Sequence, residues 1–109
     1  MDFHKFAESS NELSFGDNNI AVIDVSGKKI CVTNQSGSWQ GFAYKCPHAS
    51  GVMANGYIDA MGNAVCPLHR FKFSLKTGRC NEGYFLKTYP IEEREDGLYV
   101  GIKTSIFGF

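Results

Sequence analysis

Two short segments near the middle of the chain carry the residue types best suited to binding a metal. Residues 46–48 read Cys-Pro-His, and residues 66–69 read Cys-Pro-Leu-His. Thiolate and imidazole are ligands of zinc and of iron–sulfur clusters. The spacing therefore predicts a metal centre in which each segment gives one thiolate and one imidazole, from Cys46, His48, Cys66 and His69.

Two kinds of metal centre fit these four ligands. One zinc ion could be held tetrahedrally, but zinc sites usually place two or more residues between paired ligands, because both side chains of a turn must reach one ion. Cys46 and His48 have only one residue between them. In an extended loop, side chains two residues apart point to the same side and lie several ångströms apart. This spacing favours two neighbouring irons of one cluster, and structural zinc remains the alternative.

The second segment resembles a known family. Residues 66–73 read Cys-Pro-Leu-His-Arg-Phe-Lys-Phe, which is close to the second cluster-binding loop of the Rieske family, and the resemblance extends from about residue 3 to residue 102. It implies one [2Fe–2S] cluster per chain, with Cys46 and Cys66 on the inner iron and His48 and His69 on the outer iron. It also implies one-electron transfer, with the outer iron as the one that is reduced.

The resemblance is to one branch of that family. The respiratory-complex branch carries an additional cysteine in each loop, and the two form a disulfide; here the corresponding residues are Gly51 and Leu68. The chain is therefore more similar to soluble Rieske ferredoxins and to the small subunit of assimilatory nitrite reductase. This implies redox protein partners, such as a flavin reductase and a terminal oxygenase or reductase. A small subunit of a nitrite-reductase-like complex and a regulatory or structural metal-binding module remain the alternatives.

An enzyme in its own right is not expected. Rieske oxygenases hold their substrate iron in an additional domain, for which 109 residues leave no room. The sequence has no nucleophile elbow, no phosphate loop and no further pair of histidines for a mononuclear iron site. We therefore expect an electron-transfer protein without a small-molecule substrate of its own.

Three residues near the motif affect the details. Arg70 stands where the family usually has glycine, so the loop could be rearranged, and the arginine either favours reduction and docking or simply points to solvent. Tyr84 is expected either to shield the cluster or to belong to the core. No hydroxyl follows His69 before Ser74, which predicts a potential near the bottom of the Rieske range of about −150 to +300 mV.

Composition limits the class of protein. A chain of 109 residues with 43% hydrophobic residues is one domain, and its formal net charge of zero argues against nucleic acid or an anionic membrane as the main partner. The sequence shows no signal peptide and no apolar run of membrane-spanning length, so we expect a cytoplasmic protein. Cys31 should be a small buried hydrophobe, and a disulfide between Cys31 and Cys80 is improbable in that compartment.

Charges are expected to be unevenly distributed along this neutral chain. Basic residues adjoin the motif, whereas acidic residues gather near the end of the chain. A positive cluster end could orient the approach of an acidic partner. The residues concerned are Lys45, Arg70, Lys72 and Arg79 on the basic side, and Glu92, Glu93, Glu95 and Asp96 on the acidic side.

Short alternating runs between turn residues predict an all-β domain of antiparallel strands. Ser26-Gly27 predicts a tight hairpin, residues 34–38 a longer turn, and residues 95–97 the turn of a final hairpin. The resemblance implies one Rieske domain over 1–109, with a β-sandwich or barrel base at about 1–44 and 84–109 and an inserted cluster-binding subdomain at about 45–83. Strands are expected at 3–8, 19–25, 28–33, 39–44, 57–59, 64–65, 71–73, 86–93 and 98–104, with one helical turn at 9–13.

Overall fold

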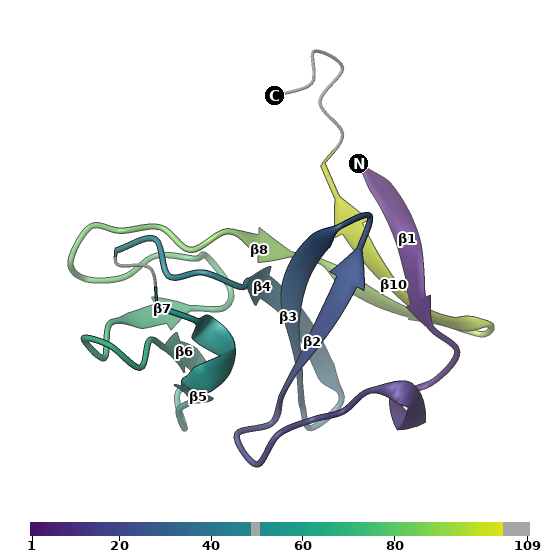
Figure 1. The fold of residues 1–109 in the computed structure, drawn as a ribbon, viewed down its shortest axis with the longest axis horizontal. Helices are drawn as coiled ribbons and strands as arrows, with labels where there is room; N and C mark the ends of the chain where they lie inside the picture. Colours follow the sequence, from purple (N-terminus) through teal and green to yellow (C-terminus); the bar gives the residue numbers. More distant parts are fainter. Residues whose placement is uncertain (49–50, 104–109) are drawn as a thin grey trace.

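The computed structural model describes residues 1–48 and 51–103 and consists of three antiparallel sheets. The first sheet has the order β1-β10-β9, the second β2-β3-β4-β8, and the third β5-β6-β7 (Figure 1). This confirms the all-β, antiparallel expectation. The elements are β1 (Asp2–Ala7), η1 (Ser10–Glu12), β2 (Ile20–Val25), β3 (Lys28–Gln35), β4 (Ser38–Ala43), η2 (Met53–Asn55), β5 (Tyr57–Ile58), β6 (Asn63–Val65), β7 (Lys72–Ser74), β8 (Thr88–Tyr89), β9 (Ile91–Arg94) and β10 (Gly97–Ile102).

Two tight turns join β2, β3 and β4. Ser26 and Gly27 both have positive φ angles, 54° and 81°, and Ser36 and Gly37 repeat this with 54° and 92°. Two successive positive φ angles are the geometry of two-residue turns that match the twist of a hairpin. The first hairpin is as predicted. The second turn is shorter than the predicted connection over residues 34–38, because β3 continues to Gln35 and β4 already begins at Ser38.

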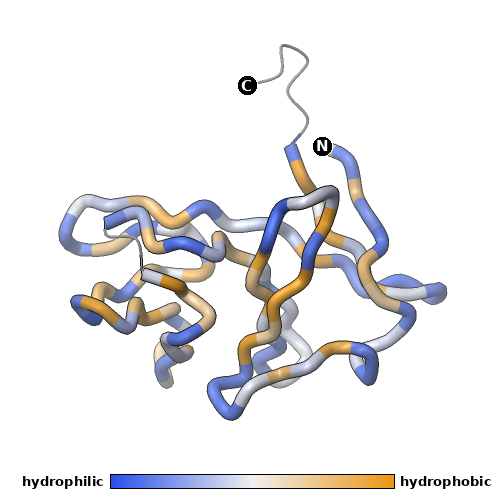
Figure 2. Tube along the Cα trace, in the orientation of Figure 1, coloured by the Kyte–Doolittle hydropathy of each residue, from blue (hydrophilic) through white to orange (hydrophobic). Residues whose placement is uncertain are grey.

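The central strand β3 is covered on both faces. Ile30 and Val32 pack into one hydrophobic cluster, between the first and second sheets, and Cys31 packs into another, on the opposite face. Successive side chains of a strand point to opposite faces, so a strand enclosed on both sides shows a continuous buried run. Figure 2 shows the hydrophobic stretches along β2 and β3 and the hydrophilic turns at their ends. The metal-binding segments are built against the Cys31 face.

One predicted strand is wrong. Residues 86–93 were expected to be one strand of the final hairpin, but they divide at Pro90 into β8, which pairs with β4, and β9, which pairs with β10. Proline has no amide hydrogen to give to a ladder and interrupts a strand. Its carbonyl oxygen still accepts a hydrogen bond from the Gly101 N–H (2.9 Å). The chain therefore passes from the second sheet to the first at this residue.

The remaining differences are local. The expected helical turn is the 3-10 turn η1, but Ser9, at its N-cap, makes no side-chain capping hydrogen bond. The 3-10 turn η2 was not expected. The strand predicted at the start of the chain lies at a sheet edge as β1, and the strand predicted over 98–104 ends at Ile102, with Thr104 outside the described residues. In the described part of the chain, no helix has the length and apolarity to cross a membrane.

The third sheet is an excursion from the second. β4 and β8 are hydrogen-bonded neighbours, so the chain between them leaves the second sheet, forms β5-β6-β7, and returns.

Asp59 shapes the turn into β6, where its Oδ1 accepts hydrogen bonds from the N–H groups of Met61 and Asn63 (both 2.9 Å). Although desolvation opposes ionisation, these bonds, together with Lys72, hold the pKa of Asp59 below its usual value. The limits 45 and 83 of the inserted subdomain stay a prediction.

Candidate metal centre

The first ligand segment follows β4 and is held by backbone hydrogen bonds. The Cys46 N–H donates to the Gly51 carbonyl oxygen (2.8 Å), and the Met53 N–H donates to the Tyr44 carbonyl oxygen (2.7 Å). These bonds fold the segment back on itself, so Cys46 lies at a fixed place at the base of the loop. Residues 49–50 are outside the described part of the chain.

The second ligand segment is a tight turn between β6 and β7. The Arg70 N–H donates to the Cys66 carbonyl oxygen (2.9 Å), and the Cys66 N–H donates to the Phe71 carbonyl oxygen (3.0 Å). Both partners belong to the same short loop, which fixes the distance from the cysteine to His69. Since Pro67 lacks an amide hydrogen, it cannot compete for these acceptors.

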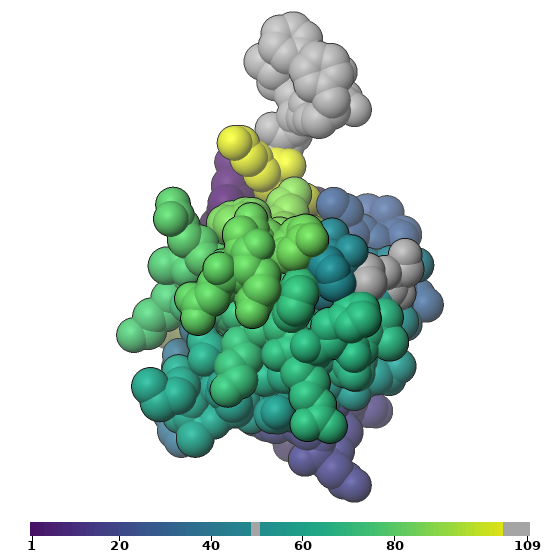
Figure 3. Space-filling model, turned by 90° about the vertical axis from the view of Figure 1, so that its left-hand side faces the viewer, coloured from purple at the N-terminus to yellow at the C-terminus, as the bar shows by residue number. Residues whose placement is uncertain are grey.

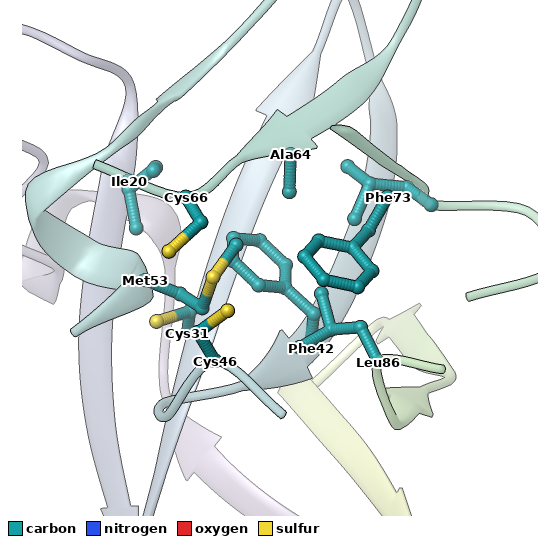
Figure 4. Packing of buried hydrophobic residues seen from close by; sticks show 10 residues of the cluster. Ile20, Cys31, Phe42, Cys46, Met53, Ala64, Cys66, Phe73 and Leu86 are labelled. Atoms are coloured by element: carbon teal, nitrogen blue, oxygen red, sulfur yellow. The ribbon is translucent and has the colours of Figure 1, made fainter. Parts of the chain in front are cut away.

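The two motif cysteines come together in one buried cluster. Cys46 and Cys66 are both buried and pack with Phe42, Phe73 and other apolar side chains, as Figure 4 shows. Cys31 belongs to the same cluster, but burial raises the pKa of its thiol to about 12. Cys31 lies on β3, outside the two ligand segments. Its expected role as a small buried hydrophobe therefore fits its surroundings.

The two motif histidines also meet, at the surface above the cysteines' segments. The rings of His48 and His69 lie 4.8 Å apart between centroids at an interplanar angle of 72°. His48 is half-buried and His69 is exposed. Around His48 lie Phe71, with its ring centroid at 4.3 Å, and Tyr84, at 4.7 Å. The structure thus brings together His48 and His69, which are separated in the sequence by η2, β5 and β6.

One atom of this group points to an external ligand. His48 Nδ1 is buried and, among the described residues, has no hydrogen-bond partner. Burying such a nitrogen without a partner costs about 1–3 kcal/mol, and native structures rarely tolerate this cost without compensation. A bond from this nitrogen to a metal would remove the cost. The donor set therefore fits a metal group of the predicted kind.

The contacts place the two motif cysteines together in the core and the two motif histidines together nearer the surface. Within the part of the chain that the structure describes, no group of three or more His, Cys, Asp or Glu side chains is arranged to hold a single metal ion.

Arg70, at the position where the resemblance implies glycine, has a backbone conformation that suits glycine. Its φ angle is 58°, in the left-handed region that glycine enters without steric cost. The loop thus keeps a conformation suited to glycine and imposes it on an arginine. Nearby, a Cβ added to Gly51 would lie 3.1 Å from Leu68 Cγ and 3.1 Å from Cys66 Sγ. Leu68 therefore packs over Gly51.

The left-handed conformation of Arg70 predicts a measurable difference between two substitutions. We expect Arg70→Gly to unfold at a higher temperature than Arg70→Ala, with a free energy of unfolding greater by about 1 kcal/mol, because only glycine relieves the left-handed conformation. Both variants remove the same charge, so the comparison isolates the backbone. Thermal unfolding followed by circular dichroism and by visible absorbance measures it. Equal midpoints for the two variants would contradict it.

Comparison with known proteins decides the family. Residues 4–91 match the Rieske [2Fe–2S] domain. The chain belongs to the Rieske [2Fe–2S] domain family. The cofactor of this Rieske chain is accordingly a [2Fe–2S] cluster, and the resemblance in the ligand loops is confirmed at the level of the family.

Individual relatives of this Rieske chain come from two kinds of system. Nitrite reductase [NAD(P)H] of Emericella nidulans is 33% identical over an alignment of 101 positions, and the match covers 84% of this chain and 8% of that protein. The 3-phenylpropionate/cinnamic acid dioxygenase ferredoxin subunit of Photorhabdus laumondii is 31% identical over an alignment of 61 positions, and the match covers 53% of this chain and 58% of that subunit. The ferredoxin of carbazole 1,9a-dioxygenase from Nocardioides aromaticivorans has a similar fold, with a TM-score of 0.78 at 20% identity, covering 94% of this chain and all of that one.

Sequence reasoning left two roles open for Tyr84 and did not identify Asn18. Tyr84 stacks on Phe71, with centroids 5.6 Å apart, and lies against His48, which fits the covering role and not the core. The Asn18 amide nitrogen donates to the carbonyl oxygens of Ala54 and Gly56 (both 2.8 Å), anchoring η2 behind the first ligand segment. No local pattern identifies Asn18, because its partners lie more than thirty residues away.

Proposed function

We propose that this Rieske chain is a one-electron carrier whose cluster is held by Cys46 and Cys66 at the inner iron and by His48 and His69 at the outer iron. The observation that carries the proposal is the buried, unpartnered Nδ1 of His48, directly beside the ring of His69. With the two cysteines buried in the core, the four donors provide two pairs of ligands at different depths.

The chain's own residues fit a carrier role. When bound, the cluster would supply a site that accepts and releases one electron. Burial of both cysteines excludes water from the inner side, and Phe71 and Tyr84 cover His48. His69 remains exposed, which leaves one short path between the metal centre and a redox partner. Nothing in this arrangement requires a substrate pocket.

The partner class is the finer part of the proposal. The chain would receive electrons from a flavin reductase and pass them to a terminal oxygenase, a role supported by its similarity to a dioxygenase ferredoxin subunit. A place as a small component of a nitrite reductase is the second candidate, favoured by the 33% identity over 84% of this chain. A cytoplasmic location is supported by Cys31 and Cys80, the two cysteines outside the motif, which form no disulfide with each other.

A redox titration tests the carrier function. We expect anaerobically purified protein to be red-brown, to contain about two iron and two sulfide per chain, and to take up one electron reversibly. The potential should lie near the bottom of the Rieske range of about −150 to +300 mV, because the residues after His69 offer no hydroxyl before Ser74. Electron paramagnetic resonance of the reduced protein should give a lower average g value than all-cysteine clusters give.

Two outcomes would contradict the proposal. Stoichiometric zinc without visible absorbance would replace the cluster with a structural site. A cluster that cannot be reduced and reoxidised without loss of iron would exclude a carrier. A second experiment separates the two partner classes. The reduced chain is mixed either with the terminal oxygenase of a dioxygenase or with a nitrite reductase that lacks its Rieske part, and product formation shows which enzyme accepts the electrons.

A further inference from the structure

The charges of this neutral chain are divided between its two ends. The cluster end, defined as residues 45–87, contains six basic and two acidic side chains, whereas the rest of the chain contains five basic and nine acidic ones. The basic residues of the cluster end are Lys45, Arg70, Lys72, Lys76, Arg79 and Lys87, and its acidic residues are Asp59 and Glu82. A net charge of zero therefore conceals a strong dipole.

The fold keeps the two sets of charges apart. The cluster end forms one side of the molecule, and the β9–β10 hairpin, with four acidic residues at 92, 93, 95 and 96, extends on the opposite side (Figure 1). Figure 3 looks directly onto the cluster end, whose residues fill most of that face. The exposed His69 belongs to this positively charged end of the chain.

The cluster end also exposes apolar side chains. Leu68 is 57% exposed, Phe85 58% and Tyr84 39%, and Pro47 and Pro67 lie beside the ligands at the surface. Arg79 lines one surface pocket with Tyr84 and Phe85. Aromatic and arginine side chains are enriched at protein-binding hot spots. Tyr84 contacts His48, so a partner bound to these side chains would be separated from the predicted ligand His48 by one aromatic ring.

Some of the basic side chains are already neutralised and others are not. Within the described residues, the ion pairs join Lys5 to Glu8, Lys72 to Asp59 and Arg94 to Glu92. Arg70 and Arg79 take part in none of these pairs, and both are exposed. Their charges remain available to a molecule outside the chain.

We propose that the cluster end is a docking face for a redox protein whose contact surface has an acidic rim around an apolar centre, with Arg70 and Arg79 as the residues that select it. This inference rests on the proposed electron-carrier function and adds the surface chemistry of the partner. Opposite charges steer the encounter, and the exposed apolar side chains exclude water at contact. A partner with a basic surface is rejected by the same residues.

Electron exchange with two small redox proteins of opposite charge tests this proposal. Reduced flavodoxin, an acidic protein, gives one electron to the oxidised chain, and the reduced chain gives one electron to oxidised cytochrome c, a basic protein. We expect the rate with flavodoxin to fall by about tenfold between about 20 mM and 300 mM salt, because screening removes the attraction. The rate with cytochrome c should rise over the same range.

Charge-reversal variants locate the effect. Arg79→Glu and Arg70→Glu should each slow exchange with flavodoxin by about threefold or more at low salt. Lys28→Glu is the matched control: it makes the same change in net charge at the start of β3, in the base, and should leave the rate within about twofold of the original. Iron content and reduction potential are measured for every variant, so that a rate change is compared at equal driving force.

The outcomes separate this inference from the carrier function. A chain with a normal cluster and reversible potential, but with rates insensitive to salt or slowed equally by Lys28→Glu, overturns the docking face and leaves the carrier function intact. Binding to phosphatidylserine vesicles or to duplex DNA at about 150 mM salt, lost in Arg79→Glu, would assign the basic face to another occupant and also overturn it. Loss of reversible reduction would instead overturn the carrier function.

Discussion

Cys46→Ala and Cys66→Ala are each expected to abolish the bound iron and sulfide, whereas Cys31→Ala is expected to keep both. All three cysteines are buried in the same hydrophobic cluster. They differ in that only Cys46 and Cys66 are proposed as ligands. Removing one thiolate leaves an iron with an open position, which a short apolar side chain cannot fill. Metal analysis and visible absorbance after anaerobic purification measure the effect.

Cys31→Ala controls for damage to the core. It removes a buried sulfur atom from the same cluster and should cost about 1–2 kcal/mol of stability, through the small cavity that it leaves. Because burial raises the pKa of Cys31 to about 12, its thiol is neutral at physiological pH and no thiolate is lost. Retention of full iron in either motif variant, or loss of iron in Cys31→Ala, would show that the cysteine ligands are misassigned.

The second large effect is expected at Gly78, in the turn that follows β7. Its φ angle is 80°, and a Cβ added there would collide with the carbonyl oxygen of Leu86 and lie 3.0 Å from the Phe85 ring. The Leu86 N–H donates a hydrogen bond to the Gly78 carbonyl oxygen (2.7 Å) and holds this segment against Gly78. The Leu86 carbonyl group therefore cannot move away alone. Gly78→Ala should therefore lower the free energy of unfolding by about 3 kcal/mol or more.

Gly62 provides the matched control for this substitution. It has nearly the same φ angle, 83°, and lies in the same inserted part of the chain, but a Cβ there would meet nothing within 4 Å. Gly62→Ala should cost only about 1 kcal/mol, which is the price of the left-handed conformation itself. Thermal or denaturant unfolding compares the two variants. Equal losses would mean that the collision at Gly78 is relieved by movement of the segment.

Gly78→Ala should also affect the metal centre. The segment that the added Cβ displaces continues from Leu86 back to Tyr84, which covers His48. A shift there would expose the ligand ring to water. We expect the cluster of Gly78→Ala to be lost faster on exposure to air than the cluster of Gly62→Ala, and the decay of visible absorbance measures this rate.

The sequence by itself determined the features that depend on residue type and local spacing. The Cys-x-His and Cys-x-x-His pairs identify the family of the chain, since a metal requires particular side chains at particular separations. Ser26-Gly27 predicted its hairpin because few residue pairs tolerate two positive φ angles. The limits of most strands followed from short alternating runs. Each ligand pair, turn and strand is a short stretch of neighbouring residues, whose types the sequence shows directly.

Only the tertiary structure decided the features that join distant segments. Pro90 divides one expected strand because each half finds a different partner strand, and propensity cannot reveal which sheet is near. Tyr84 meets His48, and Asn18 holds η2, through long-range packing. Such contacts depend on the path of the whole chain, and for that reason local sequence patterns do not contain them.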